Sequence, residues 1–188
     1  ARMRLIEAMF ARPGEKLLGM PEERKPPEMS MYLSVLKASG LHRQVKGQWV
    51  LVDPPHGDPC HLRPALKRIR DLIKQKPDAR VSVQTIFREL RRPPYGLRDG
   101  VIPVLLAVIA VSQEQEVALY ENGTFLREIG KDAFLRMTKA PENFDIQYCK
   151  IEGLRSEVFN ELARMLELPV KPGKAPELLH VVKQLCLF

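Results

Sequence analysis

The sequence lacks the short motifs that identify nucleotide binding and hydrolytic catalysis. No GxxxxGK[ST] phosphate loop is present, because the pairs Gly130-Lys131 and Gly173-Lys174 lack the upstream glycine. The HExxH and GxSxG patterns are also missing, and the 4 histidines lie in unrelated contexts. We therefore expect these 188 residues to hold no catalytic residue and to bind no cofactor.

Cysteine is scarce in this chain. The 3 cysteines are widely spaced and form no CxxC pair, which is typical of a reducing compartment rather than of a disulfide-linked secreted protein. They are Cys60, Cys149 and Cys186. Cys60 lies between His56 and His61, but a second pair of ligands is missing, so no metal site is expected.

Long apolar runs and targeting signals are absent as well. The longest apolar run covers residues 101–111, whereas a helix that spans a bilayer needs about 20. The N-terminal ARMRLIEAMF has neither the apolar core nor the cleavage site of a signal peptide. We expect a cytoplasmic protein that makes no membrane contact. Because the chain starts inside one helical pattern and stops inside another, we also expect it to be part of a larger parent polypeptide.

Positive charge is abundant, and it is concentrated in the first half of the chain. Residues 1–92 hold 19 basic and 10 acidic side chains, a net charge of +9, whereas residues 93–188 hold 11 and 13, a net charge of −2. Such asymmetry suits contact with nucleic acid or with an acidic protein surface. It is equally compatible with a basic face that is merely solvated.

Apolar periodicity predicts a mainly α fold with small β-hairpins, an α+β class, in three parts. In residues 1–55 it predicts helices over residues 2–11 and 29–39, followed by a hairpin around Lys46-Gly47. A helix followed by a hairpin is the second half of a winged helix, so we interpret this part as a winged-helix-like unit. Residues 151–188 are predicted to form a C-terminal helical segment that runs off the end of the chain.

Residues 56–150 are predicted to form a second winged-helix-like domain. An amphipathic helix starts near Leu62, a short strand includes Val81, and Ser82 is the predicted N-cap of the next helix. A third helix then precedes two short strands around Asn122-Gly123, the pair that favours a type I′ hairpin. This succession of three helices and a hairpin is the winged-helix order.

The end of this domain is predicted from weaker patterns. A helix is expected over residues 131–139, and the alternating apolar residues of 144–148 predict a strand at the edge of a sheet. The strand would be the last element before the C-terminal segment.

The segment RRPPYGLRDGVIPVLLAVIAV, residues 91–111, ends in an apolar helix where a winged helix normally reads DNA. Asp99 is its predicted N-cap, which places Pro103 in the first turn, where a proline is tolerated. A groove-reading helix needs exposed basic or amide side chains, and residues 101–111 contain none. Because each large apolar side chain left in water forfeits about 1.5–3 kcal/mol, we expect this helix to be buried and not to read bases.

Eight basic residues are predicted to form a sequence-independent track for phosphates. Four follow Leu62 at i, i+4, i+7 and i+11 spacing, and four lie on the next helix and in the loop behind it. They are Arg63, Lys67, Arg70, Lys74, Arg88, Arg91, Arg92 and Arg98. The alternative is that these side chains only keep helix faces solvated.

Residues 91–111, VALYENGTFL at 117–126 and LLHVVKQLC at 178–186 resemble a region of large bacterial ATP-binding proteins that lies downstream of their P-loop ATPase module. Those proteins are associated with DNA-directed and phage-defence functions. The resemblance covers the second half of the chain, from Leu62 onward. It implies that the parent polypeptide hydrolyses ATP and that this region is an accessory or coupling module. Because the phosphate loop is absent here, no catalytic residue of the family is carried over.

The expected function is therefore that of a non-catalytic winged-helix module of a larger bacterial ATP-binding protein. It would contact double-stranded DNA non-specifically through the basic helix, or couple the ATPase to DNA. The alternative is a protein-interaction scaffold whose basic face meets an acidic surface of the parent or of a partner, without nucleic acid. A salt-dependent, sequence-independent affinity for duplex DNA separates the two.

Overall fold

The structure, a computed structural model, describes residues 1–75, 79–113, 116–149 and 165, and these residues form a mixed α+β fold. The predicted α+β class is confirmed. The first part of the chain contains α1 (Arg2–Ala11), η1 (Lys16–Gly19), α2 (Pro27–Met31), η2 (Tyr32–Lys37), β1 (His42–Val45) and β2 (Gln48–Leu51). The second contains α3 (Arg63–Lys74), β3 (Arg80–Ser82), α4 (Val83–Arg91), α5 (Ile102–Ser112), β4 (Val117–Glu121), β5 (Thr124–Phe125), α6 (Lys131–Lys139), η3 (Pro141–Asn143) and β6 (Phe144–Tyr148). The predicted C-terminal helical segment lies outside the described residues, apart from Met165.

The helices of the first part follow the predicted periodicity with one local difference. α1 has the predicted bounds and buries Leu5, Ile6 and Met9. The helix predicted over residues 29–39 starts earlier, at Pro27, because proline in the first turn of a helix removes no intrahelical hydrogen bond. From Tyr32 to Lys37 the backbone continues as a π-helix, a rare form that the side-chain pattern does not predict.

Both hairpins turn through the same tight geometry. The φ angles are 51° at Lys46 and 81° at Gly47, and 49° at Asn122 and 79° at Gly123. Positive φ at both central residues defines a type I′ turn, so the prediction for Asn122-Gly123 is confirmed. Glycine adopts this backbone region without the steric cost that a Cβ atom brings.

The larger sheet has the strand order β3-β6-β4-β5, and all of its neighbours are antiparallel. Ile146 of β6 pairs with Val81 on one side and with Leu119 on the other. The prediction that β6 is an edge strand is therefore wrong. The alternating pattern that buries Phe144 and Ile146 identifies the inner face of a strand, but it is the same for an edge strand and an interior one.

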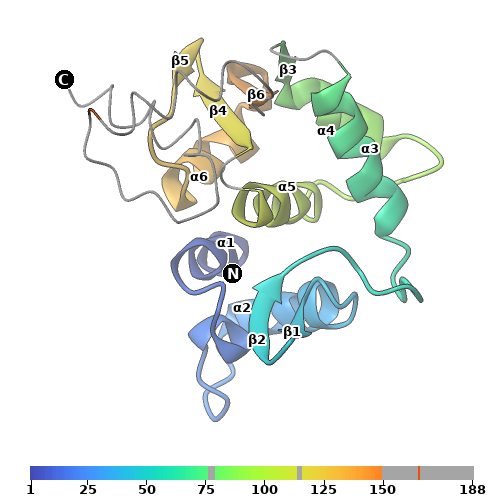
Figure 1. Cartoon of the computed structure of the whole chain (residues 1–188), viewed down its shortest axis with the longest axis vertical. Helices are drawn as coiled ribbons and strands as arrows, with labels where there is room; N and C mark the ends of the chain where they lie inside the picture. Colours follow the sequence, from blue (N-terminus) through green and yellow to red (C-terminus); the bar gives the residue numbers. More distant parts are fainter. Residues whose placement is uncertain (76–78, 114–115, 150–164, 166–188) are drawn as a thin grey trace.

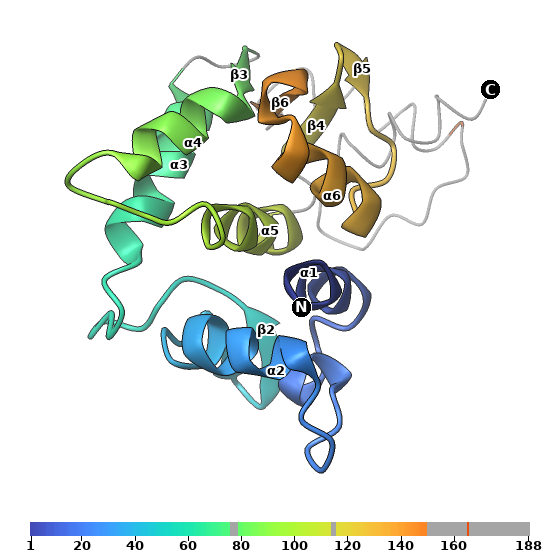
Figure 2. The ribbon, with the colours of Figure 1, turned by 180° about the vertical axis from the view of Figure 1, so that it is seen from behind.

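α5 lies at the centre of the molecule, as Figures 1 and 2 show from opposite sides. It packs against α1 and β2 on one side and against α3 on another. All residues from Ile102 to Ala110 are buried, which confirms that this helix belongs to the core. A helix that is apolar all round is stable only when it is covered all round.

Both predicted units contribute to one continuous apolar core. The buried cluster runs from Leu5 and Leu36 in the first part to Phe134 and Ile146 in the second, and α1 packs directly on α5 and α6. The division into units 1–55 and 56–150 stays a prediction from sequence punctuation. Within the described part of the chain, no helix is both long and apolar enough to cross a membrane.

Candidate nucleic-acid interface

The pattern of α3 separates a buried face from a basic one. Its buried residues are Ala65, Leu66, Ile69 and Ile73, in agreement with the predicted apolar stripe. The carboxylate of Asp58 accepts hydrogen bonds from the backbone amides of Leu62 and Arg63 at 3.0 and 2.9 Å. Because the first amides of a helix have no intrahelical partner, these two bonds stabilise the start of α3.

Two of the predicted cations on α3 are bound to residues 53–55, which follow β2 and are called the linker below. Arg70 donates from Nη1 and Nη2 to the carboxylate of Asp53 at 3.0 and 2.6 Å, and from Nε to Gln113 Oε1 at 3.1 Å. The Arg70 side chain is only 20% exposed. The guanidinium of Arg63 donates to the carbonyls of Pro54 and Pro55. These two arginines hold the linker against α3, and a phosphate would have to displace those bonds.

The two lysines of α3 are more accessible. Lys67 Nζ lies 2.7 Å from the carboxylate of Asp71, one helical turn further on, in an ion pair that is largely exposed. Lys74 Nζ lies 4.5 Å from the centroid of the Tyr148 ring. An exposed i, i+4 ion pair contributes about 0.3–0.5 kcal/mol, and an exposed cation–π contact contributes about 0.5–1 kcal/mol. Both lysines therefore remain available to an anion.

The other four predicted cations lie on α4 and in the loop behind it. α4 is anchored by Val83, Ile86, Phe87 and Leu90, which are all buried. Arg88 is on the opposite, exposed face, Arg92 directly follows the helix, and Arg98 lies in the loop before α5. These three side chains are exposed, and none makes a hydrogen bond or ion pair with the described residues.

Arg91, in contrast, is paired. Its Nε and Nη2 donate to the two carboxylate oxygens of Asp99 at 2.5 and 2.9 Å, and the centre of its guanidinium lies 5.7 Å from the centroid of the Phe87 ring. The prediction that Asp99 caps the next helix is therefore wrong. α5 begins at Ile102, and Val101 occupies the N-cap position. The carboxylate of Asp99 instead neutralises a guanidinium, which is a stronger hydrogen-bond donor than a backbone amide.

The loop between α4 and α5 is closed by backbone hydrogen bonds as well as by this ion pair. Leu97 N donates to Leu90 O at 2.8 Å, and Tyr95 N donates to Arg92 O at 3.0 Å. Arg2 of α1 also reaches the loop, with 3.5 Å between its Nη1 and the carbonyl oxygen of Asp99. These bonds restrain the backbone on which Arg92 and Arg98 are presented.

The sequence pattern predicts the cations but not most of their acidic partners. The i, i+4 spacing of Lys67 and Asp71 is a visible signal for a helical ion pair. No such signal links Arg70 to Asp53, 17 residues earlier, or Arg91 to Asp99, 8 residues later. Those pairs depend on how the linker and the loop fold back on the helices.

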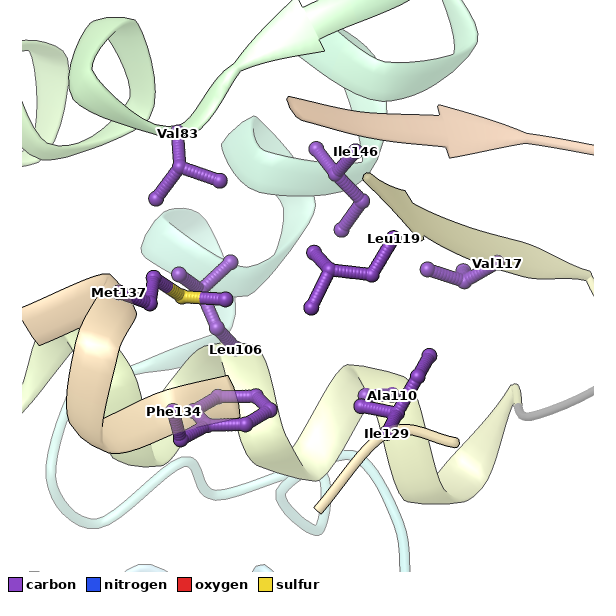
Figure 3. A pocket seen from close by; sticks show the side chains of 9 residues that line it. All are labelled: Val83, Leu106, Ala110, Val117, Leu119, Ile129, Phe134, Met137 and Ile146. Atoms are coloured by element: carbon purple, nitrogen blue, oxygen red, sulfur yellow. The ribbon is translucent and has the colours of Figure 1, made fainter. Parts of the chain in front are cut away.

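The described residues also line a small apolar cavity. A cavity of about 10 Å³ lies between the start of α4, α5, α6 and the sheet, and its volume is that of about one water-sized sphere (Figure 3). It is lined only by apolar side chains: Val83, Leu106, Ala110, Val117, Leu119, Ile129, Phe134, Met137 and Ile146. In the same described residues, no group of three or more His, Cys, Asp and Glu side chains is placed to hold a metal ion.

The predicted cations therefore differ in what they can offer a ligand. Arg88, Arg92 and Arg98 are exposed and free of partners among the described residues, Lys67 and Arg91 are in exposed ion pairs, and Arg63 and Arg70 are bound to the linker. Comparison of the chain with protein-family models, with curated proteins and with solved structures gives no match.

Proposed function

We propose that this chain is a non-catalytic, winged-helix-like module that contacts nucleic acid non-specifically through arginines at the end of α4. The observation that carries the proposal is that Arg88, Arg92 and Arg98 are exposed and unpaired among the described residues. Contacts between such side chains and phosphates are sufficient for non-specific binding, and they need no groove-reading helix.

The order of elements supports a winged-helix-like second unit. α3, β3, α4 and α5 precede the β4-β5 hairpin, which is the expected succession. β6 is an addition to that arrangement, since it is inserted in the sheet between β3 and β4. In this interpretation α5 has the place of the recognition helix, and its burial leaves α4 and the following loop to bind the phosphates.

The test is a fluorescence-anisotropy titration of labelled duplexes of two unrelated sequences at several salt concentrations. We expect equal affinity for both sequences and a steep loss of affinity with salt. The triple variant replaces Arg88, Arg92 and Arg98 by Gln. For this variant, the slope of log K, where K is the association constant for the duplex, against the logarithm of the salt concentration should become shallower. The change should be about 0.9 for each phosphate that the protein no longer neutralises.

A matched control removes the same charge from another face. Arg24, Lys25 and Lys37 are exposed residues of the first part, and replacing all three by Gln should change the slope much less. A further variant, Lys67→Gln with Lys74→Gln, measures the contribution of α3. Equal losses of affinity in the α4 variant and in the control would contradict a localised surface, and the absence of binding by the wild-type chain at low salt would overturn the proposal.

A second candidate is a protein-interaction scaffold within a larger ATP-binding parent, in which the same arginines meet an acidic protein surface. The bonds of Arg63 and Arg70 to the linker favour it, because they reduce the number of cations available for a long phosphate track. In either case the role as an accessory or coupling module of an ATPase rests on the sequence resemblance alone. A chain that ignores duplex DNA at low salt but binds an acidic polypeptide would favour the scaffold.

A further inference from the structure

We propose that Asp99 acts as an internal competitor for Arg91, so that opening one ion pair adds a fourth arginine to the nucleic-acid surface at the end of α4. This inference rests on the proposed function, because it takes nucleic-acid phosphate as the ligand. It assigns Asp99 the role of an autoinhibitory group.

The geometry of the pair is that of a guanidinium bound to a phosphate. Arg91 uses Nε and Nη2, two parallel donors, on the two oxygens of Asp99 at 2.5 and 2.9 Å. A guanidinium binds two phosphate oxygens through the same fork of donors. A phosphate that binds Arg91 in this way therefore has to replace the carboxylate of Asp99.

The exposure of the pair makes that replacement feasible. The side chains of Arg91 and Asp99 are 50% and 63% exposed, and exposed ion pairs are weak and screened by salt. The Arg70–Asp53 pair is different, because Arg70 is 20% exposed and has a third hydrogen bond to Gln113. We therefore expect Arg70 to stay bound to the linker even without its full charge balance, whereas Arg91 becomes available to a phosphate once the charge of Asp99 is removed.

The surroundings of Asp99 favour an anionic polymer as the competitor. Asp99 directly follows Arg98 and is paired with Arg91, and Arg91 directly precedes Arg92. Arg92 and Arg98 have no hydrogen-bond or ion-pair partner among the described residues. Residues 1–92 carry a net charge of +9, and duplex DNA carries one negative charge per about 1.7 Å of its axis. When Arg92 and Arg98 bind phosphates of one nucleic-acid strand, the adjacent phosphates of that strand are held close to Arg91, so their local concentration is high.

The decisive variant is Asp99→Asn, which keeps the shape of the side chain and removes its charge. In the anisotropy titration we expect it to bind duplex DNA about two- to fivefold more tightly than wild type at low salt. The slope of log K against log salt should steepen by about 0.9, the value for one more neutralised phosphate. The double variant Asp99→Asn, Arg91→Gln should return to the wild-type slope, because the released arginine is gone.

A matched control releases a cation elsewhere. Lys16 and Glu22 form another exposed pair, in the first part of the chain, so Glu22→Gln makes the same change in net charge and frees a lysine away from α4. We expect it to leave the slope unchanged. An equal increase in affinity in Glu22→Gln, or an increase that persists in the double variant, would show that net charge alone is responsible and would overturn the inference.

The remaining outcomes separate this inference from the proposed function. If the wild type binds DNA and Asp99→Asn binds no better, only the autoinhibitory role fails. If neither binds, both proposals fail. Polyglutamate is used as a second probe, and tighter binding of polyglutamate without tighter binding of DNA also overturns the inference. Asp99→Ser serves as a second variant, and circular dichroism with thermal unfolding confirms that each variant is folded before it is titrated.

Discussion

At the scale of single residues, His42 is a buried polar group whose two ring nitrogens both have a hydrogen-bond partner. It is buried, its Nδ1 lies 2.9 Å from the hydroxyl of Tyr32, and its Nε2 lies 3.0 Å from the carbonyl oxygen of Pro13. Because a carbonyl can only accept, Nε2 carries the proton and Nδ1 accepts from the Tyr32 hydroxyl. The ring also stacks on Trp49, with 5.0 Å between centroids. The neutral imidazole is therefore fully satisfied.

This arrangement predicts a pH-dependent stability. Burial lowers the pKa of His42 below its ordinary value of 6.5, and the hydrogen bond to the Pro13 carbonyl opposes this shift only in part. As pH falls below 6.5, the unfolded chain takes up a proton at His42 before the folded chain does. The stabilisation from neutral His42 is thus complete above this pH and is lost below it. Urea unfolding at about pH 7.5 and about pH 5.5 should give a lower free energy of unfolding at the acidic pH.

The control for this prediction is the variant His42→Gln, which cannot titrate. It should be less stable than wild type at neutral pH, because Gln does not fill the site between Tyr32 and Trp49. Its free energy of unfolding should depend less on pH between the two conditions. An identical pH dependence in the two proteins would assign the effect to other groups.

At the scale of elements, α4 and α5 show how two neighbouring helices take different roles. α4 buries one face and exposes Arg88 on the other, as expected for an amphipathic helix. α5 has no polar face between Ile102 and Ala110, and the fold covers it on all sides. The first can present side chains to a ligand, whereas the second can only contribute to stability.

A pair of leucine substitutions tests this difference. Leu106 of α5 is 2% exposed and lines the apolar cavity shown in Figure 3, so Leu106→Ala enlarges an existing void. We expect a loss of about 2–5 kcal/mol in the free energy of unfolding, measured by urea denaturation. Leu135→Ala on α6 makes the same chemical change at a side chain that is 37% exposed, and it should cost less than about 1 kcal/mol. Equal losses of stability would contradict the central position of α5.

At the scale of the whole molecule, the first and second parts of the chain are joined through shared apolar surface. α1 packs on α5 and α6, and β2 packs on α5. Arg63 and Arg70 add polar contacts from α3 to the linker at residues 53–55. Removing either part would expose apolar side chains of the other.

This shared core predicts a single unfolding transition. The only tryptophan of the chain, Trp49, is in β2 and reports on the first part, whereas far-UV circular dichroism reports on all helices. We expect the urea transitions followed by Trp49 fluorescence and by circular dichroism to coincide, because neither part can unfold without uncovering the other. Two separated midpoints would show instead that residues 1–55 unfold as an independent unit.

The sequence by itself determined the elements whose signals are local. Four features follow from residues that are close in sequence. They are the bounds of α1, the buried stripe of α3, the burial of α5 and the type I′ turn at Asn122-Gly123. The predicted arginine and lysine positions follow from the same local spacing. The winged-helix relation and the nucleic-acid role remain proposals.

Tertiary structure decided what depends on residues distant in sequence. The place of β6 between β3 and β4 is set by the pairing of Ile146 with Val81 and Leu119, which no local pattern encodes. The partner of Asp99 and the binding of Arg70 to Asp53 are likewise set by how loops return to the helices. Side-chain periodicity records which face of an element is buried, whereas strand order and ion pairing depend on which other segment is packed against that face.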